Sequence, residues 1–536
     1  MIKKIVRSPL FWIFILALFL RIYKLGSFPV GFHVDEAKVG WNALSILKTG
    51  RDDKGNLFSL YYNSFGDFRP TGIFYATIPS ILLFGRNEFA VRFPAALLGA
   101  LTIFPLYFLV LEINKDKNKK IALVAAILLS LSPWHIEVSR GTSEVVISMF
   151  IALWGIYYFL KGIESKNKKD FVLSVLLIVL SYFFYHSIRV LAPLFLFVII
   201  FYKKAFYKKA ILSLFVISFI TLLLLLNKEA RGRFSQVSIF NDLDVQYELS
   251  RMPFEEGPGK VFIARMFHNK PLVYARRFVN EYTKYFSSNF FLESTTPKPA
   301  RYQTVGIGLL TYVELALFIF GLIGIAQRKF SPLPLLLLLL APFAAALTTE
   351  DSPNLHRALL MLPMFAIIES YGFISLWRFK KIIITLLTLN FIFFAHMYLV
   401  HNRVHLPLYR NVGAKELAVY LSKVQGNYDK IILTNIPDDP YPWIAFFTGK
   451  DPKIFNKDAK TRDTGTWKTE NYLFTGIRCP SRDAFTVPDV KRLLVVDAEG
   501  CATESNLKTR SDVKLINVIK RTDETEVYNV WSMVSL

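Results

Sequence analysis

The stretch Ile211–Leu226, which reads ILSLFVISFITLLLLL, decides the class of this protein because it contains no charged residue. Leu10–Leu20 and Leu333–Ala341 repeat the same pattern. A soluble protein would expose such runs to water, so they indicate helices that span a membrane. Helix is the expected spanning structure because lipid cannot satisfy unpaired backbone groups. The first run is not followed by a small-residue cleavage site, and we therefore expect it to remain as a span.

The composition of the whole chain supports a polytopic α-helical membrane protein. Of its 536 residues, 53% are hydrophobic and 20% are charged, and the 49 Phe and 25 Tyr residues suit spans and their interfacial belts. Several apolar runs are shorter than the usual length of about 17–25 residues, and we expect these to extend into flanking residues or to tilt. Eleven crossings are expected, at residues 9–25, 90–111, 121–134, 144–160, 171–185, 189–202, 210–226, 305–326, 332–347, 357–377 and 382–400.

The distribution of charge sets the expected orientation. The net charge is +23, and six short segments between the spans hold twenty basic residues and only four acidic ones. This positive-inside pattern places the N-terminus in the cytoplasm and the C-terminus outside the plasma (inner) membrane. Nucleic-acid binding is not expected, because no recognition motif accompanies the charge. The basic residues are Lys3, Lys4, Arg7, Lys115, Lys117, Lys119, Lys120, Lys161, Lys166, Lys168, Lys169, Lys203, Lys204, Lys208, Lys209, Arg328, Lys329, Arg378, Lys380 and Lys381.

Three longer segments are expected outside the membrane: residues 26–89, 227–304 and 401–536. The stretch Arg69–Phe84 is amphipathic and interrupted by proline and glycine, which predicts an interfacial helix along the membrane. The chain is expected to divide into a membrane module, residues 1–400, and an extracytoplasmic α/β domain, residues 401–536. In that domain the pattern predicts a helix at Lys415–Lys423 and strands at Tyr428–Thr434, Arg492–Val496, Val513–Ile519 and Glu526–Met533.

The two cysteines, Cys479 and Cys501, both fall in the expected outside domain. Two ligands without a nearby histidine do not make a zinc pattern. An extracytoplasmic disulfide is the favoured interpretation. The alternative is a pair of unpaired buried thiols.

The densest polar cluster is His33-Val34-Asp35-Glu36, just after the first expected span. Two carboxylates beside a histidine at the membrane face are costly unless they are paired or functional. A carboxylate here could act as a general base. The alternative is structural, because Asp35 followed by Glu36 also suits the first turn of a helix.

Further polar residues gather on the same expected outer surface. An arginine at a bilayer interface can hold a lipid phosphate by paired hydrogen bonds, although snorkelling to the headgroups is the simpler interpretation for any single one. Several arginines on one face, with acids among them, favour a site that handles phosphate. No nucleotide-binding loop, nucleophile elbow or zinc-protease motif is present. The candidate binding residues are His33, Arg69, Arg140, Glu144, His186, Arg189, His356 and Arg357.

The first outside loop resembles that of the GT-C membrane glycosyltransferases, in the bacterial branch related to protein O-mannosyltransferases and to the aminoarabinose transferase of lipid A (glycosyltransferase family 39). The most specific matches are residues 33–37 (HVDEA), 64–70 (SFGDFRP) and 84–94 (FGRNEFAVRFP). The resemblance covers most of residues 1–400. Softer matches follow at Ser132–His135 through Arg140 and Glu144, at His268–Pro271, at Asn289–Leu292, and at Asn354–Arg357 with Pro363.

The resemblance implies transfer of a sugar from a polyprenyl-phosphate carrier to an acceptor outside the cytoplasm. Asp35 matches the acid that activates the acceptor, with Glu36 beside it, and Arg69 matches a basic residue against the donor phosphate. Glu144 stands at the second outside acidic position, where many relatives have Asp, and Arg357 is a second candidate phosphate ligand. The acceptor stays open among protein, lipid and glycan. A divalent metal also stays open, because metal use differs among relatives.

Two other functions remain alternatives on the sequence. A lipid or sugar transporter or flippase should carry polar residues or broken helices at mid-membrane. Here the polar groups gather at one surface, which favours catalysis at the interface. A lipid-linked oligosaccharide ligase or polymerase with a similar outline is the third possibility.

Overall fold

The computed structural model describes residues 8–64, 67–114, 116–257, 259–457, 465–484, 490–501 and 513–534. The basic residues Lys3, Lys4, Arg7 and Lys115, and Phe65 and Gly66 of the second motif, lie outside these ranges. The chain forms two compact units. Unit 1 comprises Met1–Tyr23, Tyr61–Gly72 and Ala95–Met397, and unit 2 comprises Lys24–Leu60, Ile73–Pro94 and Tyr398–Leu536. The expected boundary near residue 401 lies close to the last of these divisions, but two segments of the first outside loop also belong to unit 2.

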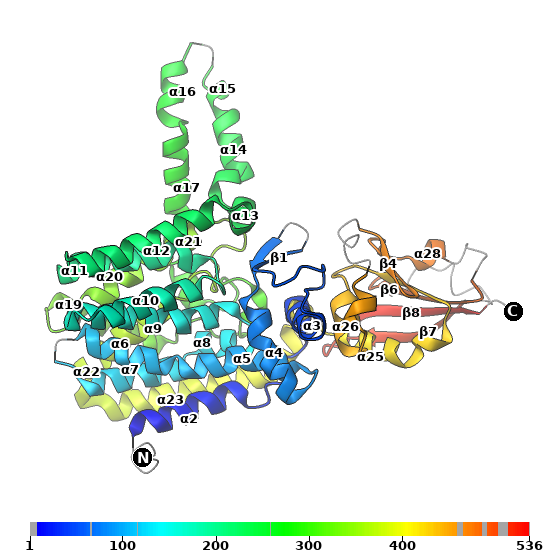
Figure 1. Ribbon diagram of the computed structural model, residues 1–536, viewed down its shortest axis with the longest axis horizontal. Coiled ribbons are helices and arrows are strands. Elements are labelled where there is room, and N and C mark those ends of the chain that lie inside the picture. Colours follow the sequence, from blue (N-terminus) through cyan, green and yellow to red (C-terminus); the bar gives the residue numbers. More distant parts are fainter. Residues whose placement is uncertain are drawn as a thin grey trace. The chain divides into compact units, whose positions relative to one another are not determined.

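Unit 1 is a bundle of apolar helices (Figure 1). Every expected span in the described residues contains at least one helix, because each apolar run is bounded by polar residues that end it. Asn118 and Asn167, for example, accept hydrogen bonds from backbone N–H groups in the first turns of α7 and α10. The bundle helices are α2 (Pro9–Ile22), α6 (Ile103–Ile113), α7 (Lys119–Leu131), α8 (Pro133–Arg140), α9 (Glu144–Ser165), α10 (Lys168–Ser181), α11 (Ser187–Lys203), α12 (Lys208–Leu226), α19 (Tyr312–Ala326), α20 (Leu333–Leu340), α21 (Phe343–Ala346), α22 (Met361–Ser375) and α23 (Lys380–His396).

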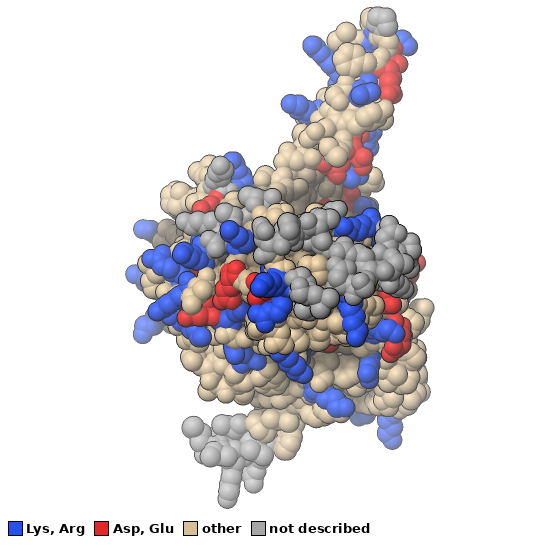
Figure 2. All heavy atoms as spheres, turned by 90° about the vertical axis from the view of Figure 1, so that its right-hand side faces the viewer, with Lys and Arg blue, Asp and Glu red and all other residues tan. Residues whose placement is uncertain are grey.

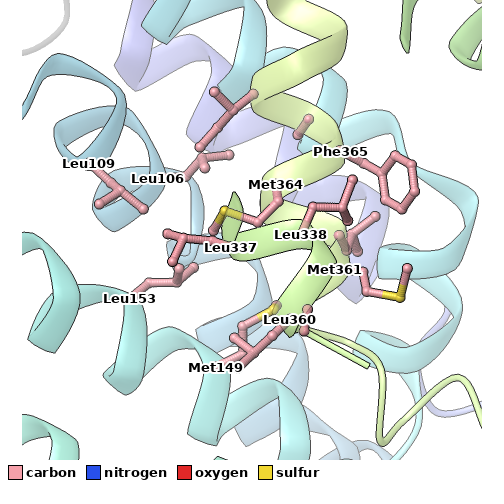
Figure 3. Close-up of a cluster of buried hydrophobic side chains, with 14 of the residues drawn as sticks. Leu106, Leu109, Met149, Leu153, Leu337, Leu338, Leu360, Met361, Met364 and Phe365 are labelled. Carbon is pink, nitrogen blue, oxygen red and sulfur yellow. The ribbon is translucent and has the colours of Figure 1, made fainter. Parts of the chain in front are cut away.

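The core of the bundle is made of aliphatic and methionine side chains from helices far apart in the sequence. Figure 3 shows α6, α9, α20 and α22 contributing side chains that point toward one another. Burial of this kind stabilises the bundle in proportion to the packed area. The labelled residues are Leu106, Leu109, Met149, Leu153, Leu337, Leu338, Leu360, Met361, Met364 and Phe365.

Among the described residues, four helical segments are long and apolar enough to cross a membrane, namely Glu88–Ile113, Glu144–Ser165, Lys208–Leu226 and Trp377–His405. A fifth span is obtained if α7 and α8 count together, although the chain bends by 56° between them. Pro133 begins α8, and Ser132 caps it by accepting from the N–H of His135, which explains the break. The other expected spans hold shorter apolar helices, so the figure of eleven crossings stays a prediction.

Two hairpins complete unit 1. Strands β1 (Tyr61–Ser64) and β2 (Asp67–Pro70) form an antiparallel hairpin, with Tyr62 opposite Arg69. A second, helical hairpin extends from the bundle at the top of Figure 1. Its elements are α14 (Leu243–Ser250), α15 (Met252–Glu255), α16 (Val261–Phe267) and α17 (Lys270–Lys284), and α13 (Lys228–Val237) joins it to α12; α18 (Ser288–Leu292) follows it.

Unit 2 contains a six-stranded mixed sheet with strand order β4-β5-β3-β6-β8-β7. β3 pairs in parallel with β5 and β6, and the remaining pairs are antiparallel. One face carries an apolar cluster that includes Ile432, Val495 and Trp531. The strands are β3 (Lys430–Thr434), β4 (Trp467–Thr469), β5 (Tyr472–Thr475), β6 (Arg492–Ala498), β7 (Val513–Lys520) and β8 (Glu526–Val534). The helices are α3 (Val34–Thr49), α4 (Gly72–Phe84), α24 (Asn402–His405), α25 (Ala414–Val424), α26 (Tyr441–Phe447), α27 (Pro452–Phe455) and α28 (Ser481–Ala484), and α5 (Glu88–Leu101) runs on into unit 1.

Several sequence predictions in unit 2 can be compared with this sheet. The helix at Lys415–Lys423 is α25, and the four predicted strands are β3, β6, β7 and β8 with small shifts at their ends. The structure also joins Cys479 and Cys501 in the expected disulfide. The stretch Arg69–Phe84 is not one helix, because Arg69 and Pro70 belong to β2 and α4 begins at Gly72.

Candidate functional site

The N-terminus of α3, in unit 2, holds the cluster that the sequence singled out. His33 is the N-cap, and its Nδ1 accepts a hydrogen bond from the Asp35 N–H at 3.1 Å. Glu36 completes a capping box by accepting from the N–H of His33. His33 and Glu36 therefore make the contacts of a helix-capping turn, and the binding and catalytic roles expected of them stay predictions.

Glu36 is enclosed by two arginines of unit 2. Its side chain is 3% exposed, and its Oε2 lies 3.0 Å from Arg92 Nη2 and 2.8 Å from Arg410 Nη2. Burial alone would raise the pKa of this carboxyl, but the charges of Arg410 and Arg92 and the hydrogen bonds from Arg92 and the His33 N–H outweigh it and lower the pKa. A carboxylate locked in this way is a poor proton acceptor, so its role here is to hold the turn.

Asp35 stands beside this ion-pair network but is not part of its core. Its side chain is 19% exposed, and its Oδ2 lies 3.6 Å from His33 Nδ1. Because that nitrogen accepts the Asp35 N–H, a neutral His33 ring carries its proton on Nε2. The two adjacent acids thus differ sharply in environment, as expected of neighbours that point in different directions on a helix.

The C-terminal part of unit 2 packs against the loop before α3 and holds it by hydrogen bonds. Arg410 Nε donates to the carbonyl of Val30, and Trp443 Nε1 donates to the carbonyl of Phe32 at 2.6 Å. Gly31 has φ +73°, and a Cβ there would lie 2.5 Å from the carbonyl oxygen of Arg410. Only glycine satisfies both the conformation and the close approach. Residues beyond 400 therefore hold the loop that carries Asp35.

The arginines of the predicted site lie in unit 1, where Arg69 and Arg189 come together with His186. His186 Nε2 donates to the carbonyl of Phe68 at 3.0 Å, next to Arg69 on β2. Arg189 Nη1 lies 3.0 Å from His186 Nδ1, and its guanidinium covers the ring of Tyr61 at 5.3 Å. The β1–β2 hairpin is thus fastened to the start of α11. Arg69 is half-buried on this hairpin, and His186 and Arg189 position the strand that carries it.

Arg140 has a structural task in unit 1. It is buried, and its guanidinium donates to the carbonyls of Leu20, Arg21 and Tyr23 at 2.8 to 3.2 Å. These carbonyls close the C-terminal end of α2, where a cation is favoured. Arg140 therefore caps this helix, and the expected contact with a substrate stays a prediction.

Tyr302 lies against both His356 and Gly141, the residue three positions before Glu144. Glu144 is half-buried in the first turn of α9, three residues after Gly141, whose Cβ would lie 2.7 Å from the Tyr302 ring. The ring centroids of Tyr302 and His356 are 4.3 Å apart. Sequence reasoning missed Glu137, which is buried in the same region and accepts a hydrogen bond from Thr304 Oγ1. An acid four residues after Pro133 inside a matched motif was the signal available for it.

Arg357, the second candidate phosphate ligand, already has an acidic partner. Its Nη2 lies 3.2 Å from Glu350 Oε2, and its Nη1 donates to the Thr348 hydroxyl at 2.7 Å and to the Glu350 carbonyl at 2.6 Å. Glu350 is exposed, so a phosphate would have to compete with this pair. Within the described ranges no group of three or more His, Cys, Asp or Glu side chains could hold a metal ion.

The comparison with protein families gives a partial match. The model of the family described as dolichyl-phosphate-mannose-protein mannosyltransferase matches residues 69–226. The resemblance to membrane glycosyltransferases is confirmed over this segment. It contains Arg69 at the end of β2 and the chain from α4 to α12, and with them Arg140, Glu144, His186 and Arg189. No curated protein matches the chain.

The chain is also similar to two solved structures, AglB and ArnT. The archaeal oligosaccharyltransferase AglB from Archaeoglobus fulgidus, in complex with an inhibitory peptide and a dolichol-phosphate, is 12% identical with a TM-score of 0.45. That match covers 83% of this chain, which spans 63% of the length of AglB. ArnT from Cupriavidus metallidurans, bound to undecaprenyl phosphate, is 12% identical with a TM-score of 0.44, and the match covers 99% of this chain and 97% of ArnT.

Proposed function

We propose that this protein is a membrane glycosyltransferase that moves a sugar from a polyprenyl-phosphate carrier to an acceptor hydroxyl on the extracytoplasmic side. The observation that carries the proposal is the contrast between Asp35 and Glu36. Glu36 is locked between two arginines, whereas Asp35, at the same helix N-terminus, is 19% exposed and lies 3.6 Å from His33 Nδ1. The family match over residues 69–226 supports the reaction class.

In the proposed reaction Asp35 is the general base. The acceptor oxygen attacks the anomeric carbon of the sugar, and its proton passes to the Asp35 carboxylate. The bond between that carbon and the carrier phosphate breaks, and the phosphate leaves with the electron pair. Negative charge grows on the leaving phosphate, so a cation placed against it lowers the barrier. We assign this role to Arg69.

The other predicted binding residues take supporting roles in the proposal. His186 and Arg189 hold the strand of Arg69 through the Phe68 carbonyl and the Tyr61 ring. Glu36, Arg92 and Arg410 hold the turn of Asp35. Glu144 and His356 are proposed to face the acceptor. Arg357 is proposed to bind the phosphate only when the phosphate displaces Glu350 from it.

The proposal is tested by incubating the purified full chain with radiolabelled polyprenyl-phosphate sugars and candidate protein, lipid and glycan acceptors. Transfer should release free polyprenyl phosphate in equal amount to labelled product, both identified by mass spectrometry. The same donors in sealed vesicles test the transporter alternative. Movement of intact labelled donor across the bilayer without cleavage would overturn the proposal in favour of a flippase.

A further inference from the structure

The helical hairpin α14–α17 of unit 1 presents an unusual surface around its far end. α16 reads VFIARMF, and all of its side chains except Ala264 are exposed. Phe262 is 79% exposed, and Phe254 of α15, beside it, is 84% exposed. A short helix that exposes apolar side chains on nearly all sides is unstable in water unless something apolar covers it. We call Phe254 together with Val261–Phe267 the apolar tip.

The acidic residues of the hairpin are largely used inside it. Glu248 pairs with Arg276 and lies 3.8 Å from His268, and Glu256 lies 3.5 Å from the same histidine. Near the base, Arg277 pairs with Asp242 at 3.0 Å. These contacts tie the two arms together, while Glu255 of α15 is exposed and accepts a hydrogen bond from the Tyr247 hydroxyl.

The basic residues around the apolar tip lie outside these ion pairs. Lys260, Arg265 and Lys270 are exposed and make no ion pair with any residue that the structure describes. In Figure 2 the hairpin, at the top, is mostly tan, with blue side chains toward its far end and red ones along one side. An apolar surface ringed by unpaired cations is complementary to an anionic bilayer surface, which offers acyl chains and lipid phosphates together.

The base of the hairpin joins apolar parts of the bundle. α13 follows α12, one of the segments long enough to cross a membrane, and packs against it. On the return, α17 packs against α21, and the Tyr282 hydroxyl donates to the carbonyl of Leu339 at 2.6 Å. The hairpin therefore leaves and re-enters the bundle at the ends of apolar helices, where a bilayer surface is expected.

The apolar tip contains a pocket that could accept part of a lipid molecule. It has a volume of about 540 Å³ and lies between α15 and α16, with Phe254, Val261, Ala264, Arg265 and His268 among its lining residues. The lining of this pocket is chiefly apolar and includes the cation Arg265. This suits an acyl chain beside its phosphate better than a soluble polar ligand.

We propose that the apolar tip of this hairpin docks on the bilayer through anionic phospholipids, so that the hairpin is an interfacial anchor of the bundle. Each cation near a negatively charged membrane surface favours the bound state by about five-fold. The apolar side chains supply the part of the binding that does not depend on lipid charge. This role is independent of the proposed sugar transfer.

The test uses the full chain in phosphatidylcholine vesicles with and without phosphatidylglycerol. The native cysteines are joined in a disulfide, so a fluorophore attached to Phe262→Cys, or to Phe254→Cys as a second reporter, labels one site. Lys468→Cys, exposed on β4, is the matched control. We expect lipids with brominated acyl chains to quench the tip label at least two-fold more than the control label, and aqueous iodide to reach it less.

The charge variant K260Q/R265Q/K270Q separates the two contributions, since it removes no ion pair among the described residues. It should abolish the extra quenching that phosphatidylglycerol gives and keep the quenching in phosphatidylcholine. Equal access of iodide to the tip and control labels in both lipids would overturn the proposal. So would protection that grows with protein concentration and with energy transfer between labelled copies, because the surface would then be an interface between chains.

Discussion

Replacement of Arg410 by methionine tests the ion-pair network under Asp35. Arg410 is almost fully buried, and its Nη2 lies 2.8 Å from Glu36 Oε2. Methionine fills much of the volume of the arginine stem and removes only the charge and its hydrogen bonds. Arg92 keeps both of its contacts to Glu36, at 3.0 Å each, so the carboxylate does not become wholly unpaired.

The expected cost follows from this geometry. Two unit charges about 4 Å apart interact by about 4 kcal/mol at an effective dielectric constant of about 20. Part of this is recovered because the buried guanidinium of Arg410 no longer has to be desolvated. We therefore expect the free energy of unfolding of unit 2 to fall by about 2–3 kcal/mol. For a domain of its size each kcal/mol lowers Tm by about 2–4 °C.

Thermal unfolding of the purified full chain measures this change, since Trp41 and Trp443 are buried in unit 2 and report on its packing. Arg403→Met is the matched control, because Arg403 is exposed on the same segment and should leave Tm unchanged. Glu36→Gln should cost more than Arg410→Met, because it leaves two buried arginines without a counter-charge, whereas Arg410→Met leaves Glu36 paired with Arg92. An unchanged Tm for Arg410→Met, or a smaller effect for Glu36→Gln, would refute the reasoning.

The effect of Glu36→Gln on Tm should depend on pH in a direction that follows from the pKa of Glu36. The pKa of Glu36 is lowered in the folded state, so its contribution is complete above the unfolded pKa of about 4.3 and is lost as the pH falls toward the folded value. The difference in Tm between the native chain and Glu36→Gln should thus be constant from about pH 6 to 8 and shrink below about pH 4.5. A difference that shrinks on raising the pH would contradict the assignment.

Three further predictions concern the donor site, the disulfide and the topology. Arg69→Ala should weaken binding of a polyprenyl-phosphate sugar by about 1.5–3 kcal/mol, and Arg69→Lys should restore only part of it; equal binding by both variants and the native chain would make Arg69 a headgroup anchor. Thiol labelling of the denatured, non-reduced chain should find no free thiol, and opening the bridge between Cys479 and Cys501, which are 22 residues apart, should cost about 3 kcal/mol. A reporter active only outside the cytoplasm should give signal when fused after residue 401, whereas a cytoplasmic signal there would exclude eleven crossings.

Local patterns explain why much of the architecture could be predicted. Charge-free runs such as Ile211–Leu226 specify helices without reference to the rest of the chain, and α12 covers this run. β6 is similarly evident from the buried apolar run at Arg492–Val496. β4 and β5 were missed because they are short and are joined at Glu470-Asn471, where Glu470 adopts a positive φ without a glycine to signal the turn.

Contacts between distant segments could not be predicted from one sequence. Glu36 and Arg410 are 374 residues apart, and nothing in either neighbourhood indicates the other. For the same reason Arg140 was expected to bind substrate, whereas it closes the end of α2 more than a hundred residues earlier in the chain. The sequence pattern singles out the polar residues, but only the structure shows which partners each of them has.

The central claim is that Asp35 accepts the proton of the acceptor hydroxyl, and the most direct measurement is the transfer rate of Asp35→Asn beside its Tm. Asparagine keeps the size and removes the charge. Glu524→Gln, at an exposed acid of unit 2, is the matched control. We predict a loss in turnover of about 10²–10⁴-fold for Asp35→Asn, with donor binding and Tm close to native and the control fully active. Near-native turnover in a protein destabilised by about 1 kcal/mol would show instead that Asp35 only caps a helix, and would contradict the proposed function of this residue.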